Sequence, residues 1–532
     1  MNTPPFGHGS ASAHAPAAQT SLPALVRRAA LILALATGLG ACGGGGDAGS
    51  SPFPPDPGSG TPPPVQVTAT PQACAPTNPY RGDATAPTTV GSLAHEKAWL
   101  YSYMNQAYLW YGEMPAVSAD ASTYSNLADV PGSLSKYFQA LTTPALTASG
   151  KRRDQFSFTY PTKAWNDLSQ SGQSFDYGIG WSTVPSAAPW GVKVAYVEAG
   201  SPAAAAGLQR GDALVSVDGV QVDSLTSRSA LYARLYPSDM NSHQLVFNTR
   251  SAVLAGATVT QHPVPLFKVL DVGGKKVGYI VFNAHMGTAE ADLITAFTQL
   301  QAAAVDELVL DMRYNGGGYL YVASQLAYMI AGNARTNGKV FDQLQYNNKR
   351  AADTAKSATP FFSTSFYFDA NFNPTRTVPL PTLNMGRVAV LTSADTCSAS
   401  EAVINGLRGV DVDVRLIGGT TCGKPYGFAA EDNCGISYFP IEFQGVNAKG
   451  YGDYADGMSA TCKATDDYSH ALGDVAENQL SAALYNLTNG SCNPAISSAH
   501  ARAMSVHGGQ VARLLRGPER ESLILTPRLN GP

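Results

Sequence analysis

The stretch RVAVLTSADTCSASEAVINGLRG, residues 387–409, joins an apolar run to the start of a helix through a short polar turn. The run RVAVLT has the length and composition of a buried strand. A strand, a turn and a helix in this order form the unit from which parallel sheets with crossover helices are built. The stretch therefore predicts an α/β core around it.

The same order recurs along the chain from residue 267. Apolar strands and amphipathic helices alternate in KVGYIVFNA (276–284), AEADLITAFTQLQAAA (289–304), ELVLDMRYNGGG (307–318), YLYVASQLAYMIAG (319–332) and VRLIGGTTCGKPYGF (414–428). This alternation predicts a core over 267–495 with a mostly parallel sheet. Ligands of such sheets collect at the carboxyl ends of the strands.

Three of these strand ends carry residues suited to acyl-transfer chemistry: a glycine cluster at 315–318, Ser398, and Gly423 with Lys424. A serine at a strand-to-helix turn is exposed beside N–H groups that stabilise negative charge. A desolvated lysine can take the serine proton. Ser398 and Ser400 before Glu401 are also a common helix start. Nucleophile and helix cap are both open interpretations at this point.

A different pattern precedes the core. YGIGWS (177–182) and GVKVAYV (191–197) lead into EAGSPAAAAGLQRGDALVSVDGVQV (198–222), where Asp218-Gly219 predicts a hairpin. Residues 173–266 resemble the PDZ domain of bacterial proteases. The resemblance implies that the loop Gly178-Ile179-Gly180-Trp181 binds a C-terminal carboxylate, with the peptide added as a strand. The alternative is a structural module whose groove is blocked.

The first folded segment is predicted to be helical and to span 91–172. HEKAWLYSYMNQAYLWY (95–111) has a broad apolar face at helical spacing, and a second helix is expected from Gly132 to Leu141. Aromatic stripes of this kind usually belong to a core. With the PDZ-like and α/β parts, the segment predicts an α+β multidomain protein.

An export signal is predicted at residues 1–42. Arg27 and Arg28 precede the apolar run AALILALATGLGA, which is too short to span a bilayer and ends at Cys42. The end, Leu39-Gly40-Ala41-Cys42, resembles the bacterial lipobox, which implies lipidation of Cys42 and an envelope lipoprotein, with the outer membrane favoured. The alternative is an ordinary signal with a chance cysteine. A Gly/Pro-rich tether is expected over 43–90.

Composition excludes some functions. The 532 residues carry a net charge of -4, which offers no footprint for nucleic acid. No cysteine or histidine cluster has zinc spacing, so no metal site is predicted. Six cysteines follow Cys42, and an even number in an exported chain suggests disulfides with 15 possible pairings.

Three motifs in order carry a resemblance to the C-terminal processing, or tail-specific, proteases over about 175–430. They are LDMRYNGGGYL (310–320), TCSASE (396–401) and GGTTCGKPYGF (418–428). The resemblance implies Ser398 as nucleophile, Lys424 as general base, and an oxyanion hole from the N–H groups of Gly317, Gly318 and Ala399. It also implies polypeptide substrates recognised through their C-termini, and no cofactor.

The sequence departs from that family pattern in one position. Many members place a glutamine four residues after the lysine, where Phe428 stands here. The lysine must then be oriented by Tyr426, by Glu401 or by a backbone carbonyl. Because related branches use a histidine base, His285 and His470 are reserve candidates.

Two disulfides are predicted on this basis. If Ser398 and Lys424 serve one site, the neighbouring Cys397 and Cys422 come close enough to pair. Cys434–Cys462 is predicted within the C-terminal part, and the tail 496–532 is left unassigned.

The function expected from these observations is a serine endopeptidase of the cell envelope. The main alternative is a catalytically inactive binding or scaffold protein of the same fold, for which Phe428 is the best argument. A hydrolase of small esters is a further alternative, less suited to the PDZ-like segment.

Overall fold

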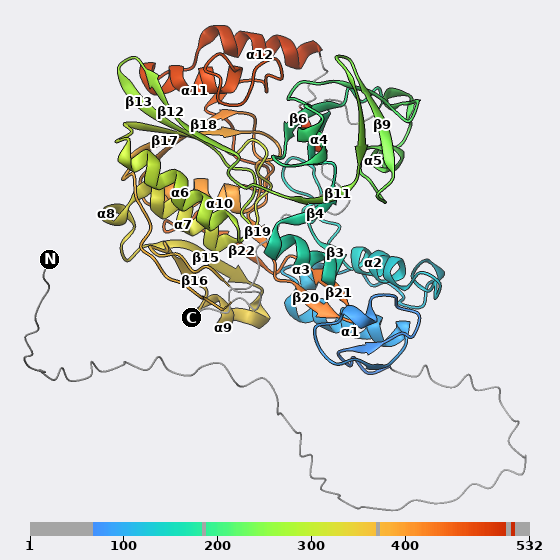
Figure 1. Ribbon diagram of the computed structural model, residues 1–532. Coiled ribbons are helices and arrows are strands. Elements are labelled where there is room, and N and C mark those ends of the chain that lie inside the picture. The colour runs from blue at the N-terminus through green and yellow to red at the C-terminus, as the bar shows by residue number, and fades with distance from the viewer. Residues whose placement is uncertain (1–66, 184–187, 369–372, 507–511, 516–532) are drawn as a thin grey trace, which may run out of the picture. The chain divides into compact units, whose positions relative to one another are not determined.

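The computed structural model describes residues 67–183, 188–368, 373–506 and 512–515, apart from the side chains of 168–171 and 506 (Figure 1). The predicted signal with Cys42 and the first half of the predicted tether, 43–66, lie outside these residues. Within them, no helix combines the length and apolar character needed to cross a membrane.

A six-stranded sheet forms the centre of the fold. Its order is β12 (Leu266–Val272), β13 (Lys275–Val281), β14 (Glu307–Asp311), β17 (Arg387–Thr392), β18 (Asp413–Gly418) and β23 (Cys462–Lys463). All neighbours pair in parallel except β12, which joins β13 as an antiparallel edge strand. The prediction of a mostly parallel sheet is confirmed.

Helices cover both faces of this sheet (Figure 1). One face packs against α6 (Ala289–Ala302), α7 (Leu320–Ala331) and α10 (Ala399–Gly409), and the other against α11 (Asn478–Asn489). Because both faces are buried, the strands read as continuous apolar runs in the sequence. The crossover helices place the ends of β14, β17 and β18 side by side, so three turns meet at one edge of the sheet.

Further elements of the core region lie outside the central sheet. They include α8 (Asn333–Thr336), β15 (Val340–Tyr346), α9 (Ala351–Thr354), β16 (Ala358–Pro360), β19 (Tyr426–Gly427), β20 (Glu431–Asn433), β21 (Ile436–Phe439), β22 (Phe443–Val446) and α12 (Pro494–Val506).

The PDZ-like segment has its own apolar core, which includes Trp181, Leu231 and Leu245. Its elements are β4 (Gln173–Asp176), β5 (Ile179–Thr183), β6 (Lys193–Val197), α4 (Pro202–Ala205), β7 (Leu214–Val217), β8 (Val220–Gln221), α5 (Arg228–Leu235), β9 (Ser242–Phe247), β10 (Ser251–Ala255) and β11 (Ala257–Thr260). The predicted hairpin at Asp218-Gly219 is confirmed, since β7 and β8 pair as antiparallel neighbours.

The N-terminal segment shares its core with the region that follows the lysine turn. It contains β1 (Ala73–Cys74), β2 (Thr89–Val90), α1 (Leu93–Ala107), α2 (Val130–Ala140), β3 (Phe158–Pro161) and α3 (Thr162–Ser171). Strand β3 pairs with β21, and Phe138 and Phe158 pack in one cluster with Phe428 and Tyr438. The segment therefore forms one wall of the region around Lys424.

The predicted tether, 43–90, extends too far. Cys74 is buried and its strand β1 pairs with β2. A disulfide joins Cys74 to Cys434, and Gln72 exchanges hydrogen bonds with Asn433 and Cys434. Residues from Gln72 onward are part of the folded body because these contacts hold them to the β20–β21 turn.

The predicted Cys434–Cys462 disulfide is wrong. Cys434 pairs with Cys74, and Cys462 pairs with Cys492. The two predicted partners lie on different sheets: Cys434 follows β20, whereas Cys462 is on edge strand β23 of the central sheet. The other predicted bond, Cys397–Cys422, is present.

Candidate active site

Ser398 occupies the turn between β17 and α10. It is the N-cap residue of α10 and has φ of 56° and ψ of -116°. A non-glycine residue takes a positive φ only where its surroundings enforce it, and such residues concentrate at functional sites. The residue is 3% exposed. An ordinary N-cap has extended backbone, so this conformation distinguishes Ser398 from a simple cap.

The carboxylate of Glu401 holds this turn against the lysine turn. Its Oε2 accepts hydrogen bonds from the backbone N–H of Ser398 at 3.0 Å and from that of Lys424 at 2.8 Å. Its Oε1 accepts from Thr421 Oγ1 at 2.6 Å and from the N–H of Gly423 at 2.9 Å. Burial raises the pKa of Glu401, and these four hydrogen bonds oppose that rise. One carboxylate thus joins the two residues predicted to react.

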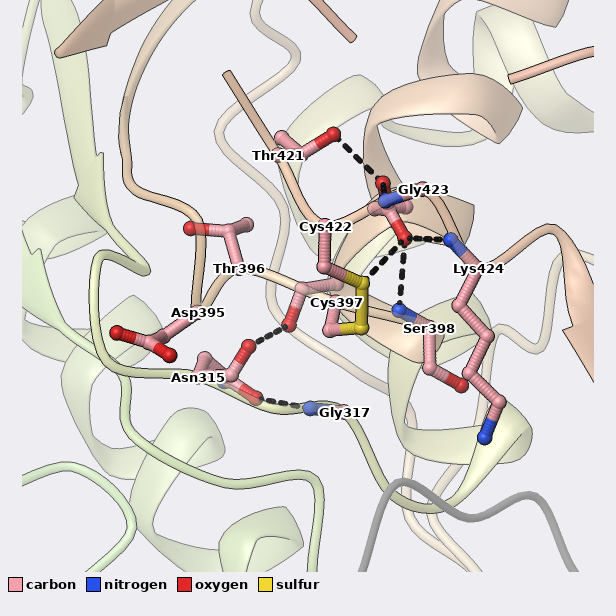
Figure 2. The surroundings of a disulfide bond; sticks show 12 residues. Asn315, Gly317, Asp395, Thr396, Cys397, Ser398, Thr421, Cys422, Gly423 and Lys424 are labelled. Carbon is pink, nitrogen blue, oxygen red and sulfur yellow. Dashed lines mark hydrogen bonds between the residues drawn. A yellow bond between two sulfur atoms is a disulfide. The ribbon is translucent and has the colours of Figure 1, made fainter. Parts of the chain in front are cut away.

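A disulfide reinforces the same junction. Cys397 and Cys422 have Cα atoms 5.2 Å apart, and each stands next to one of the two turns. The N–H of Cys397 donates to the carbonyl of Asn315, which ties in the glycine turn. Figure 2 shows the Ser398 hydroxyl and the end of the Lys424 side chain on the same side of this disulfide. The three motifs thus converge on one place.

Lys424 is almost completely buried, with 1% of its surface exposed. Its Nζ lies 4.0 Å from the centroid of the Phe428 ring and 5.4 Å from that of Phe156. Burial moves the pKa of the amine well below its ordinary value, although the charges of Asp154 and Glu401 act in the opposite direction. A neutral amine at moderate pH is the form required of a general base.

Phe428 stands at the position where many members of the family that the sequence resembles have a glutamine, four residues after the lysine. Phe428 is fully buried and packs on the lysine amine. Of the proposed alternatives for orienting the lysine, Glu401 binds its backbone N–H. Tyr426 instead packs edge-on against Trp110, with ring centroids 4.8 Å apart.

The glycine turn approaches Ser398 so closely that a side chain is excluded. A Cβ atom added to Gly317 would lie 2.8 Å from the Cβ of Ser398, and both Gly317 and Gly318 have positive φ. The N–H of Gly317 donates to Asn315 Oδ1 at 2.9 Å. Ala399 supplies the first backbone N–H of α10, at the positive end of the helix dipole.

His285 contacts the glycine turn through Asn315. Its Nδ1 lies 3.0 Å from Asn315 Oδ1, while Asn315 Nδ2 donates to the carbonyl of Phe282. Because the amide oxygen can only accept, His285 carries its proton on Nδ1. Burial lowers the pKa of His285 to about 3, so it is neutral at pH 7. His470 pairs with Asp467 and is partly exposed, in a segment remote in sequence from the three motifs.

A buried ion-pair network fixes the other side of the glycine turn. Arg313 is fully buried and bonds Asp311, Asp466 and Glu477. Asp466 also bonds Arg210 of the PDZ-like segment, at 2.5 Å. The residues of the predicted peptide loop, Gly178 to Trp181, lie in the PDZ-like segment rather than in this site, and the Trp181 ring is part of that segment's core.

The roles of three supports of the site were not predicted from the sequence, although Asn315 and Thr421 stand inside two of the three motifs. Thr421 and Asn315 act through hydrogen bonds to Glu401 and to the glycine turn. Asp154 contributes charge near Lys424 from a segment 270 residues earlier, and no local sequence signal marks it. The spacing of Ser398 and Glu401, which matches a capping box, was the available signal for the carboxylate.

Loss of the Cys397–Cys422 disulfide is expected to reduce both stability and catalysis. Changing both cysteines to alanine should lower the free energy of unfolding by roughly 2–4 kcal/mol and lower kcat, because the two turns lose a covalent link. The double alanine variant of Cys462 and Cys492 is the matched control, since Cys397–Cys422 spans 25 residues and Cys462–Cys492 spans 30. It should lose similar stability, measured by urea unfolding, with little change in kcat. Equal losses of kcat in both variants would contradict a role for the first bond in positioning.

Three segments of the chain match known family models. Residues 276–427 match Peptidase family S41, residues 95–158 match the Peptidase S41 N-terminal domain, and residues 193–233 match a PDZ domain. The first match contains Ser398, Lys424 and the three motifs, except Phe428 at the end of the third.

Curated relatives carry related descriptions. The chain is 32% identical over 133 residues to a carboxyl-terminal-processing protease of Picosynechococcus sp., covering 24% of this chain and 32% of that protein. It is 30% identical over 148 residues to a chloroplastic C-terminal processing peptidase of Tetradesmus obliquus, covering 25% of this chain and 32% of that protein. The matched segment thus spans about a third of the length of these relatives.

One solved structure supports the fold over a larger part of the chain. A putative S41 protease from Bacteroides fragilis superposes with a TM-score of 0.57 and 24% identity, covering 74% of this chain and 97% of that one. At this identity the likeness concerns the fold alone.

Proposed function

We propose that the chain, whose residues 276–427 match Peptidase family S41 and whose residues 95–158 match the S41 N-terminal domain, is a serine endopeptidase of the C-terminal processing type, with Ser398 as nucleophile and Lys424 as general base. The observation that carries the proposal is the Glu401 carboxylate, whose Oε2 accepts from the backbone N–H of both residues. This bridge supports a common site for a strained serine and a buried lysine.

The reaction follows from these groups. Ser398 Oγ attacks the scissile carbonyl carbon and gives its proton to the neutral Nζ of Lys424. Backbone N–H groups of Ala399 and Gly318 would stabilise the negative oxygen. The N–H of Gly317, which was also expected to do so, donates to Asn315 Oδ1 instead. The C–N bond then breaks, and Lys424 returns the proton to the leaving amine. Water hydrolyses the acyl-enzyme, Lys424 takes its proton, and Ser398 Oγ recovers a hydrogen as the acid leaves.

A closed resting state accompanies this mechanism. Ser398 and Lys424 are 3% and 1% exposed, so we expect the surrounding segments to move when a polypeptide binds. The same closure lowers the pKa of Lys424 through desolvation. Water exclusion that prepares the base therefore also restricts access of the substrate.

Substrate selection and location are further parts of the proposal. The loop Gly178 to Trp181 would receive the C-terminal end of a polypeptide, by β-strand addition. Export with lipidation of Cys42 and attachment to the outer membrane would place the enzyme in the envelope, and three disulfides support an oxidising compartment. Cys42→Ala should release the protein from the membrane fraction; retention there would contradict the anchor.

Labelling with a fluorophosphonate probe tests the site assignment. The full-length chain should be labelled and should degrade casein, whereas Ser398→Ala should lose both activities. Lys424→Ala should be labelled at least about 100-fold more slowly, because its serine lacks a base. Ser400→Ala, which changes a neighbouring hydroxyl bonded to the carbonyl of Asn315, serves as the control and should still be labelled.

The alternative function is a non-catalytic binding protein of the same fold. It is favoured by Phe428, which replaces a polar partner of the lysine with a ring. A folded wild-type chain that neither reacts with the probe nor cleaves peptides with free apolar C-termini would support this alternative. Labelling with hydrolysis of small esters but no peptidase activity would favour an esterase.

A further inference from the structure

The C-terminal part of the chain returns to the PDZ-like segment as a strand. β24 (Arg513–Leu515) pairs antiparallel with β5, in the register Arg513 with Thr183 and Leu515 with Trp181. Strand β6 occupies the other edge of β5. The edge of β5 that follows the loop at Gly178 is thus filled by the protein's own chain.

The last side chain of β24 is buried in the PDZ-like segment, as that of a bound peptide would be. Leu515 is 2% exposed and packs in the apolar cluster that contains Leu231 and Leu235 of α5. Its carbonyl accepts a hydrogen bond from the hydroxyl of Tyr236 at 2.6 Å. A strand paired with β5 and a leucine against α5 together fill a groove between strand and helix.

The direction of β24 also fits that of a bound polypeptide end. Because Leu515 faces Trp181 and Arg513 faces Thr183, the chain runs toward the loop at Gly178. A substrate whose carboxylate reached this loop by strand addition would run the same way. Tail and substrate end would therefore compete for one backbone edge, since an edge can pair with only one strand.

A second anchor connects β24 to the nucleophile turn. Asp395, three residues before Ser398, accepts hydrogen bonds from the N–H of Leu514 at 2.7 Å and from Arg513 Nε at 3.1 Å. Leu514 packs against Tyr314 of the glycine turn. β24 therefore touches the PDZ-like groove and two turns of the candidate active site at once.

We infer that residues 513–515 are a self-ligand of the PDZ-like groove, which a substrate polypeptide with an apolar C-terminus must displace. The inference rests on the proposed function for the identity of the competitor, but the occupied groove can be tested without catalysis. While β24 occupies the groove, the apparent affinity for a peptide is reduced in proportion to the fraction of molecules whose groove is empty. Removal of the strand should therefore lower the Kd of the peptide about ten-fold or more.

The experiment measures binding of a fluorescein-labelled peptide with the sequence of residues 510–515, QVARLL, and a free carboxylate. Full-length chains carrying Ser398→Ala are used so that the peptide stays intact. Leu515→Glu places a charge in the apolar cluster and should release β24, lowering the Kd at least about ten-fold. Ala501→Glu, at an exposed position of α12, adds the same charge outside β24 and should bind as the parent does.

A chain ending at Val511 is the second variant, and it should also bind the peptide more tightly. In the parent chain, saturating peptide should speed hydrogen exchange of the Leu514 and Leu515 amides, which needs no substitution in β24. Unchanged or weaker binding in both variants, or unchanged exchange, would overturn the inference and make β24 a permanent strand of the module. Failure of the wild type to react with a fluorophosphonate would contradict the proposed function and leave this binding result intact.

Discussion

Replacement of Lys424 by methionine is expected to lower kcat/KM for peptide cleavage by about 10³-fold, within the range for loss of a general base. Methionine keeps an apolar, unbranched side chain beside Phe428 and Phe156, whose rings lie 4.0 and 5.4 Å from Nζ. The variant therefore removes the amine with little change in packing. Cleavage of a quenched fluorescent peptide measures the loss.

The pH dependence of the wild type follows from the same burial. Desolvation lowers the pKa of Lys424 well below the ordinary lysine value of 10.5. The base acts in its neutral form, so kcat/KM should fall as pH decreases through this lowered pKa. The midpoint should lie well below pH 10.5, and the rate should be constant above it.

Lys424→Met should change stability in the opposite direction to activity. In the unfolded chain Lys424 binds a proton below pH 10.5, whereas in the folded chain burial disfavours that proton. Stability from this group is therefore lost as pH falls from 10.5 toward the folded pKa. Lys424→Met removes that penalty and should raise the melting temperature at neutral pH, as substitutions at strained sites often do.

Lys449→Met is the matched control, because Lys449 is half-exposed and pairs with Asp411 at the surface. It should keep wild-type kcat/KM. Two results would remove Lys424 from the role of base: retention of more than about a tenth of the activity in Lys424→Met, or a pH midpoint near 10.5.

The α/β core could be predicted because its signals are local. Buried parallel strands are continuous apolar runs, and their order along the chain brings the ends of β14, β17 and β18 together. Ser398 and Lys424 follow two neighbouring strands of this sheet, so the topology alone predicts that they meet.

The errors involve contacts between distant segments. Cys434 and Cys462 are close in sequence, yet Cys434 bonds Cys74 across 360 residues. The composition of residues 72–90 resembles a linker, but pairing of β1 with β2 and contacts of Gln72 make it part of the fold. Neither the Cys74–Cys434 bond nor the folding of residues 72–90 is marked by a pattern in the nearby sequence.

Strand β24 was unpredictable for a related reason. The run RLL at 513–515 is too short for a periodic signal, and its burial depends on pairing with β5, more than 300 residues earlier. Glu401 was visible as a first-turn acid, whose expected role was to complement the helix dipole. Its hydrogen bonds to Gly423 and Lys424 could not be predicted locally, because they form only when the fold brings the lysine turn to the start of α10.

Glu401→Gln is expected to reduce kcat by about 10–100-fold while the protein still folds. The two carboxylate oxygens accept four hydrogen bonds, and three of the donors are backbone N–H groups. An amide NH₂ in place of either oxygen faces at least one backbone N–H and leaves it unpaired. A buried unpaired donor costs roughly 1–3 kcal/mol, and about 1.4 kcal/mol in a barrier is tenfold in rate.

A positioning role for Glu401 predicts a signature that general destabilisation does not. The charge of Glu401 raises the pKa of Lys424, against the larger effect of burial. Removing this charge should move the midpoint of the kcat/KM profile to lower pH while the plateau falls. Loss of stability alone would reduce the folded fraction and leave the midpoint unchanged.

Glu290→Gln supplies the control because Glu290 is also buried and accepts hydrogen bonds from Gln325, Phe366 and Tyr367, remote from Ser398 in sequence. It should lose comparable stability and keep both plateau and midpoint per folded molecule. If Glu401→Gln and Glu290→Gln behaved alike, the carboxylate would be only a structural support of α10. A fall in plateau and midpoint confined to Glu401→Gln would mean that one buried acid sets both the geometry and the basicity of the lysine.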